Sequence, residues 1–149
     1  MVEVQNGTGS RLPCPHRDIA GWAAAAWRSS KLREEGSSLC IRLVDRAEGR
    51  RLNVRFANKD APTNVLAFDG DGVDHMGDLA ICLAVARAEA RAQHKTVRNH
   101  LAHLVVHGAL HLQGYDHRTE SEARRMESRE VEVLEELGIR NPYRTDVRS

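Results

Sequence analysis

The strongest constraint in the sequence is the segment 107–117, which reads H-x-x-x-H-x-x-G-x-x-H. His107 and His111 are four residues apart, so a helix places them on one face, one turn apart. Gly114 allows the chain to leave that helix, because glycine adopts a positive φ at little cost. The turn that follows can bring His117 back toward the first two histidines. The pattern therefore predicts a helix that ends in a cluster of three imidazoles.

This spacing is typical of a metal site. Three neutral imidazoles leave one coordination position open, which is the ligand set of a catalytic zinc rather than of a closed structural one. We therefore expect one Zn²⁺ per chain, bound by His107, His111 and His117. Nickel and copper also accept imidazole ligands, and zinc is preferred for its abundance and its geometry. A lone histidine on a helix is more often a surface or core residue, but chance rarely produces three with this spacing.

Zinc peptidases of the metzincin type share this spacing, and in them a Glu directly after the first His acts as the general base. Here that position is Gly108. The metal ligands are present but the base of the peptidases is missing. The sequence therefore argues against proteolysis and for another hydrolysis at a similar metal site.

The remaining sequence predicts one small α/β (α+β) domain over residues 1–149, with a small mixed sheet, about five helices and the metal site at the end of a central helix. A helix starting at Asp78 is apolar almost all round, so we expect it to be buried at the centre. A tail starting at Asn141 is expected to fray, above all over 144–149. We expect strands at 2–5, 39–45 and 64–68, a loop at 69–77, and further helices at 18–32, 46–56, 97–112 and 119–137.

Composition limits where the protein works and what it binds. The net charge of +1 predicts no strong overall attraction to nucleic acid. Residues 42–59 are basic and residues 119–137 acidic. If the segments lie apart, they would make a two-faced molecule, but charge alone slightly favours two solvated helix faces. The three cysteines form no disulfide or C-x-x-C pattern, and no apolar run has transmembrane length. We therefore expect a cytoplasmic protein that does not bind membranes.

Several segments together resemble one family. The run H-G-A-L-H-L-Q-G-Y-D-H at 107–117 resembles the signature of the YbeY proteins, bacterial metal-dependent endoribonucleases linked to ribosomal RNA maturation. D-A-P-T-N-V-L-A-F at 60–68 and G-D-L-A-I-C at 77–82 resemble further family segments in the same order, as do Leu137-Gly138 and Pro142-Tyr143. The resemblance covers about residues 39–143 and is weaker in the N-terminal third.

The resemblance implies a single-strand-specific endoribonuclease that acts in 16S rRNA 3′-end maturation and ribosome quality control. Its partners would be single-stranded RNA and the small ribosomal subunit, and no DNA is expected. Basic residues of 42–59 and 87–98 would hold the RNA backbone, with Arg55, Asn64 and Arg98 as candidates for the substrate groove. His103, one turn before His107, is expected to orient a ligand imidazole. Spacing assigns no general base, so Arg55 and Asp116 are weak candidates for a catalytic role.

Two other classes of function remain open at this point. The first is a metallohydrolase that acts on a peptide or an amide instead of a nucleic acid. The second is a non-catalytic assembly factor that binds the small ribosomal subunit and uses its metal for structure only.

The sequence departs from the family pattern at one position that bears on catalysis. The family segment N-x-x-[YF]-R-x-x-D corresponds to residues 53–60, and Ala57 stands where the family has Arg. A guanidinium there would bind a phosphate through two hydrogen bonds and stabilise transition-state charge. Arg55 is two residues away and would lie on another face of a helix. Weakened activity, a substitute Arg elsewhere and a deliberate change are all consistent with this departure.

The variant Ala57→Arg tests whether the missing guanidinium is catalytic. If it is, the rate of RNA cleavage should rise by roughly 100-fold, the typical contribution of one transition-state donor. Initial rates on a single-stranded RNA measure the effect, with Ala57→Gln as a control of similar length without the charge. Equal rates for all three proteins would dismiss a catalytic role for an arginine at this position.

Overall fold

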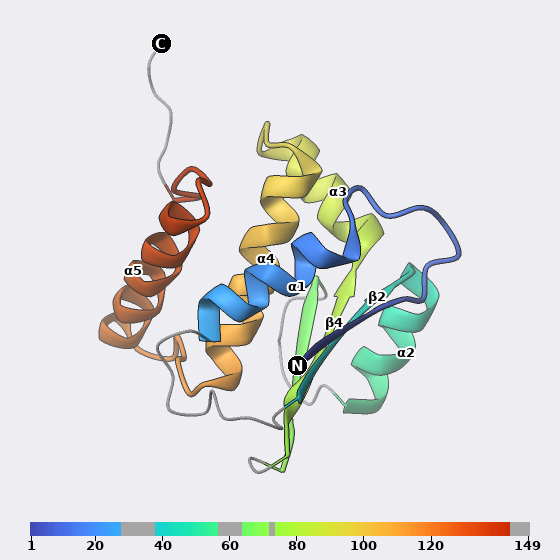
Figure 1. Ribbon diagram of the computed structural model, residues 1–149, viewed down its shortest axis with the longest axis horizontal. Coiled ribbons are helices and arrows are strands. Elements are labelled where there is room, and N and C mark those ends of the chain that lie inside the picture. Colours follow the sequence, from blue (N-terminus) through green and yellow to red (C-terminus); the bar gives the residue numbers. More distant parts are fainter. Residues whose placement is uncertain (28–37, 57–63, 72–73, 144–149) are drawn as a thin grey trace.

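The computed structural model describes residues 1–27, 38–56, 64–71 and 74–143, and these form four strands and five helices (Figure 1). The combination of one mixed sheet with five helices confirms the predicted α/β class. The first residues of the family-like segment 60–68, the end of the helix expected to reach residue 32, and the tail 144–149 lie outside the described residues. In chain order the elements are β1 (Val2–Asn6), α1 (His16–Trp27), β2 (Ser38–Val44), α2 (Arg46–Phe56), β3 (Val65–Asp69), β4 (His75–Cys82), α3 (Leu83–Ala92), α4 (Val97–Leu112) and α5 (Glu120–Glu136).

The four strands form one mixed sheet in the order β1-β2-β4-β3. β1, β2 and β4 run parallel, and β3 is antiparallel to β4. Side chains alternate between the two faces, so Leu39, Ile41 and Leu43 of β2 all point into the main core, as their spacing predicts. Val44 and Ala80 belong to a smaller cluster on the other face.

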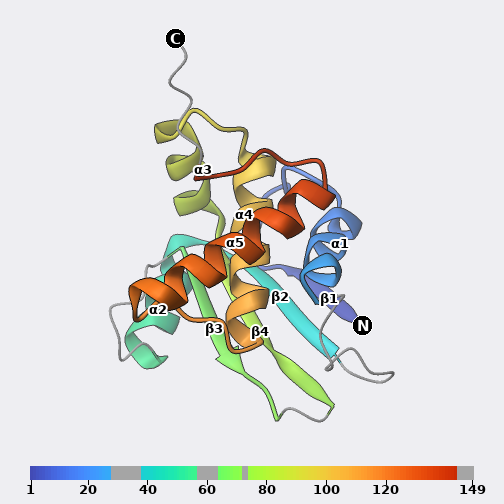
Figure 2. The same cartoon turned by 90° about the vertical axis from the view of Figure 1, so that its left-hand side faces the viewer.

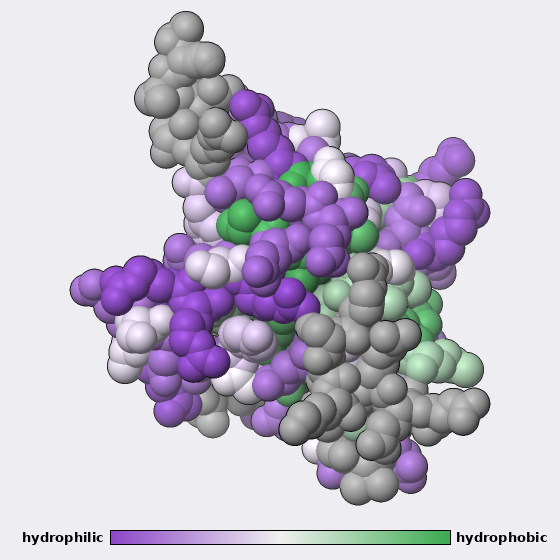
Figure 3. Space-filling view, turned by 60° about the vertical axis from the view of Figure 1, so that its left-hand side comes forward, coloured by the Kyte–Doolittle hydropathy of each residue, from purple (hydrophilic) through white to green (hydrophobic). Residues whose placement is uncertain are grey.

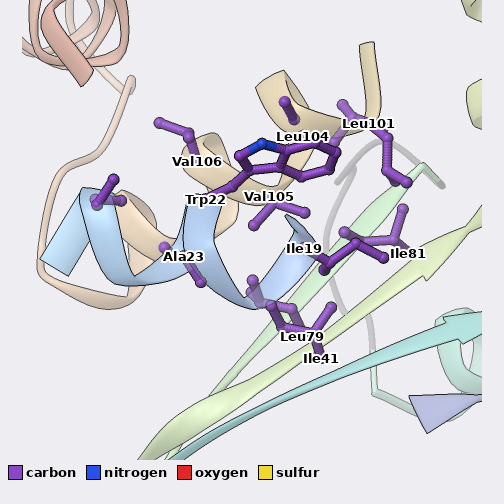
Figure 4. Packing of buried hydrophobic residues seen from close by; sticks show 14 of the residues in the cluster. Ile19, Trp22, Ala23, Ile41, Leu79, Ile81, Leu101, Leu104, Val105 and Val106 are labelled. Carbon is purple, nitrogen blue, oxygen red and sulfur yellow. The ribbon is translucent and has the colours of Figure 1, made fainter. Parts of the chain in front are cut away.

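Helices cover both faces of the sheet (Figures 1 and 2). α4 is the central helix among them. α1 and α4 pack on one face, α5 packs against α4, and α2 lies on the opposite face, where Leu52 joins the smaller cluster. In the main core, Ile19 and Trp22 of α1 meet the apolar stripe of α4 and the sheet (Figure 4). No helix among the described residues is long and apolar enough to cross a membrane.

The prediction of a central helix starting at Asp78 was wrong, because residues 75–82 form β4 and the helix begins only at Leu83. β4 lies between β2 and β3, and helices cover both of its faces. Such a strand is apolar on both sides, and its periodicity cannot be distinguished from that of a buried helix. Asp78 therefore caps no helix and instead pairs with His75 at 3.0 Å.

The segment 141–143 is held in place, contrary to the expectation that it frays. The backbone of Tyr143 donates to the Asn141 side chain at 2.8 Å, and Lys95 Nζ donates to the carbonyl of Pro142 at 3.3 Å. The Tyr143 hydroxyl donates to the carboxylate of Glu130 on α5. These contacts hold the end of the described chain against the turn between α3 and α4 and against α5.

Gly108 sets how closely α4 approaches the sheet. A Cβ atom at this position would lie 2.8 Å from Leu79 Cδ2 of β4 and 3.3 Å from Val65 Cγ1 of β3. A side chain here would therefore point into the sheet and push α4 away from it. A glutamate at this position would also point toward the sheet, so the missing peptidase base follows from the packing of α4.

The variant Gly108→Ala should lower the free energy of unfolding by about 1 kcal/mol, since overpacking costs ~1–3 kcal/mol and the gain in helix propensity is ~1 kcal/mol. Leu79 is only 1% exposed and has little room to move aside. The matched control is Gly21→Ala in α1, where no atom lies within 4 Å of the added Cβ, so stability should rise. Urea denaturation measures both, and equal stabilisation by the two changes would contradict the packing argument.

Candidate metal centre

The C-terminal end of α4 presents the predicted histidine cluster. His107 and His111 lie on successive turns of α4, which ends at Leu112. Gly114 turns the chain away from the helix with a φ of 100°, and its N–H donates to the carbonyl of His111 at 3.0 Å. His117 follows three residues later. The ring centroids are 6.5 Å apart for His107 and His111, 5.9 Å for His107 and His117, and 6.0 Å for His111 and His117. Gly114 thus brings the third imidazole back to the first two.

Asp116 stabilises the turn that carries His117. Its carboxylate accepts a hydrogen bond from the backbone N–H of His117 at 2.7 Å and pairs with Arg118 Nε at 3.1 Å. The hydrogen bond from His117 is the main reason that the pKa of Asp116 lies below its ordinary value. A carboxylate with a low pKa is a weak general base near neutral pH. These contacts support a role for Asp116 in shaping the turn.

Glu130 is a buried charged residue that the sequence argument did not single out. It lies on α5 with 0% of its surface exposed, between the buried Met126 and Leu134. Its Oε2 accepts a hydrogen bond from His107 Nδ1, and its Oε1 accepts from His103 Nε2 at 3.0 Å and from the hydroxyl of Tyr143. Burial by itself raises the pKa of Glu130, but the hydrogen bonds from His103 and His107 outweigh it and lower that pKa to about 2.

One group of side chains among the described residues brings candidate metal-ligand atoms close together at this end of α4. His103, His107 and Glu130 have candidate ligand atoms that all lie within 4.8 Å of one another. This group contains His107 but neither His111 nor His117. Its atoms are already joined by hydrogen bonds, whereas the Nδ1 atom of His111 is buried without a hydrogen-bond partner among the described residues, like those of His100 and His103. α4 thus carries more imidazole nitrogens than its polar neighbours satisfy, which suits a metal-binding helix.

A second polar group lies nearer the start of α4. His100 is only 3% exposed, and its Nε2 lies 2.9 Å from Oε1 of Glu89 on α3. The side-chain amide of Asn64 donates to the same oxygen at 3.0 Å. Burial lowers the pKa of His100 despite this carboxylate. Asn64, which the sequence suggested as a residue of the substrate groove, therefore connects the start of β3 to α3.

The structure separates the remaining candidates from the histidine cluster. Arg98 lies in the first turn of α4, where it pairs with Asp18 at 3.4 Å and its guanidinium lies 5.2 Å from the ring centroid of Trp22. Thirteen residues of helix, or about 20 Å, separate it from His111. Arg55 is exposed in the last turn of α2, and Ala57 lies outside the described residues. Two of the candidates lie beside the cluster: Asp116, which binds the backbone of His117, and His103, whose ring centroid is 6.3 Å from that of His107.

Comparison with known proteins identifies the family. The family model described as "Endoribonuclease YbeY" matches residues 11–138. The chain is 44% identical to Endoribonuclease YbeY of Pseudomonas putida strain F1 over 97% of this chain and 94% of that protein. This chain belongs to the YbeY family. It is 48% identical to the YbeY of Methylococcus capsulatus over 79% of this chain and 82% of that one. The known role of this family of endoribonucleases is ribosomal RNA maturation.

A solved structure shares the fold of this chain. The solution structure of a Thermotoga maritima protein superposes with a TM-score of 0.60 over 100% of this chain and 99% of that chain. The two sequences are 24% identical, so this likeness bears on the fold alone. The two chains thus share an overall fold although their sequences differ widely.

Proposed function

We propose that this YbeY-family endoribonuclease cleaves single-stranded RNA at a zinc ion held by His107, His111 and His117. In the cell it would act on the 3′ end of 16S rRNA and in ribosome quality control, in the cytoplasm and on the small ribosomal subunit. The observation that carries the proposal is the triangle of three imidazoles at the end of α4, with centroids 5.9–6.5 Å apart, in a chain of this family.

The three imidazoles fit zinc because imidazole nitrogen is one of its usual ligands. Two of them lie on successive turns of α4, and the third lies in the turn after Gly114. When bound, zinc would supply a Lewis acid for a phosphoryl oxygen or lower the pKa of a water to about 7. The chain itself provides rigid ligands, since α4 is buried along most of its length and Asp116 holds the turn of His117. His103 and Glu130 lie on the α5 side of the cluster.

The charge distribution supports a polyanionic substrate. Several arginines on α2 and α3 are exposed and form no ion pair with any described residue: Arg46, Arg50, Arg51, Arg87 and Arg91. The acidic residues of these helices are engaged elsewhere, because Glu48 binds Arg42 and Glu89 faces Asn64 and His100. These free guanidinium groups suit an RNA backbone, with a contribution that weakens as salt rises.

The acidic helix α5 lies away from α2, so the two charged segments form separate sides of the molecule (Figures 1 and 2). Hydrophilic residues dominate the molecular face on the α5 side, with small apolar patches between them (Figure 3). This arrangement favours the two-faced molecule over charges spread evenly around one domain. An RNA strand would then approach along the sides that carry α2 and α3.

The two alternatives differ in their support. Position 108 disfavours a peptidase-like metallohydrolase, because a glutamate at this position would point into the sheet and could not act as the general base. A non-catalytic assembly factor with a structural metal draws support from Ala57, which stands where the family has Arg.

The variant His111→Ala should lose the bound metal and with it the cleavage of single-stranded RNA. Native mass spectrometry measures the zinc content per chain, and end-group analysis of the RNA products measures cleavage. The matched control is His16→Ala, an exposed histidine at the start of α1 that should change neither. One equivalent of zinc still bound to His111→Ala would refute the proposed ligand set.

Removing zinc with a chelator separates a catalytic metal from a structural one. For a catalytic metal, the chelated protein should keep its far-UV circular dichroism and its cooperative unfolding while losing RNA cleavage, which should return when zinc is added. The core of α1, α4 and the sheet is built without the metal, which is why the fold should persist. Global unfolding on chelation would indicate the assembly factor with a structural metal.

A further inference from the structure

We propose that Glu130 is a positioning residue for the metal centre: its carboxylate fixes His107 with a proton on Nδ1, so that Nε2 is free to bind the metal. This inference rests on the proposed ligand set of His107, His111 and His117 but assigns a role to a residue outside it. The contacts that carry it come from α5, which follows α4 in the chain and packs against it in the fold.

The hydrogen-bond pattern determines which atom of His107 carries a proton. An ionised carboxylate only accepts hydrogen bonds, so the ring nitrogen that faces it must donate. His107 Nδ1 faces Glu130 Oε2 and therefore carries the proton. A neutral imidazole with a proton on Nδ1 has its lone pair on Nε2, which is the form that binds a metal.

The other oxygen of Glu130 is held at the same time. Its Oε1 accepts hydrogen bonds from His103 Nε2 at 3.0 Å and from the hydroxyl of Tyr143. The Tyr143 ring packs edge-on against His103 with centroids 5.4 Å apart. With both oxygens engaged, the carboxylate has one orientation, and so does the His107 ring bonded to it. Tyr143, at the end of the described chain, thus helps to fix the metal site through Glu130.

Burial makes a purely structural role for Glu130 a poor explanation. The residue is 0% exposed in the α4–α5 interface, with Met126, Val133 and Leu134 as its buried neighbours on α5. Desolvating a carboxylate is expensive, and apolar residues of similar volume often serve packing as well or better. A buried charge that faces two histidines and a tyrosine is therefore better explained by the orientation that it imposes.

The test is zinc affinity, measured by competition with a chromophoric zinc chelator in wild type, Glu130→Gln, Tyr143→Phe and the control Glu135→Gln. Glu130→Gln keeps the shape of the side chain but lets an amide face His107, so zinc should bind roughly 10–100-fold more weakly. Tyr143→Phe should weaken binding less, and Glu135→Gln, which removes an exposed charge from the same helix, should have no effect. Unchanged affinity in Glu130→Gln, or a larger loss in Tyr143→Phe, would overturn the proposal.

A second measurement does not depend on how well the variants fold. In metal-free wild-type protein, ¹⁵N chemical shifts of the His107 ring should show the proton on Nδ1 and a lone pair on Nε2. A proton on Nε2 would overturn the assignment. The variant His111→Ala then separates this inference from the ligand set: if it loses zinc while Glu130→Gln binds normally, only the role of Glu130 fails. If His111→Ala retains zinc while Glu130→Gln loses it, Glu130 is itself a ligand and both proposals fail.

Discussion

The packing of α4 between the sheet and α5 is the constraint on which the rest of this structure depends. α4 approaches β3 and β4 closely because Gly108 has no side chain, and its apolar residues meet α1 and the sheet in one continuous core. A helix held on several sides has little freedom to rotate or shift. The histidines on its remaining side therefore have fixed positions before any metal arrives. Preorganisation of this kind lowers the entropic cost of binding a ligand.

The same helix carries a row of polar groups at its interface with α3 and α5. His100, His103 and His107 follow one another along α4, with Glu89 at one end and Glu130 beside the other. A buried carboxylate such as that of Glu130 seldom adds stability compared with an apolar residue. Its benefit is orientation, because each hydrogen bond restricts the rotation of an imidazole. The fold thus gives up some stability in its core and gains a defined arrangement of histidines at the end of α4.

The surface charges of the molecule are also unevenly distributed. α2, which carries several exposed arginines, lies on the opposite side of the molecule from the acidic helix α5 (Figure 1). Because the net charge is only +1, this separation could not be inferred from composition. The distance between the segments in the fold makes the charge asymmetry meaningful, since opposite charges that were close together would have paired.

Local sequence was enough to predict the histidine helix, the turn at Gly114 that follows it, and the inward face of β2. These features depend on local spacing and on the conformational preferences of single residues. It could not determine that 75–82 is a strand, because a segment buried on both sides has no distinctive period. Nor could it reveal that Glu130 faces His107 or that Tyr143 is held, because 23 residues separate the first pair and 13 separate Tyr143 from Glu130. A lone Glu in the apolar stripe of α5 was the available signal, but only the packing of α5 on α4 decided which histidine it meets.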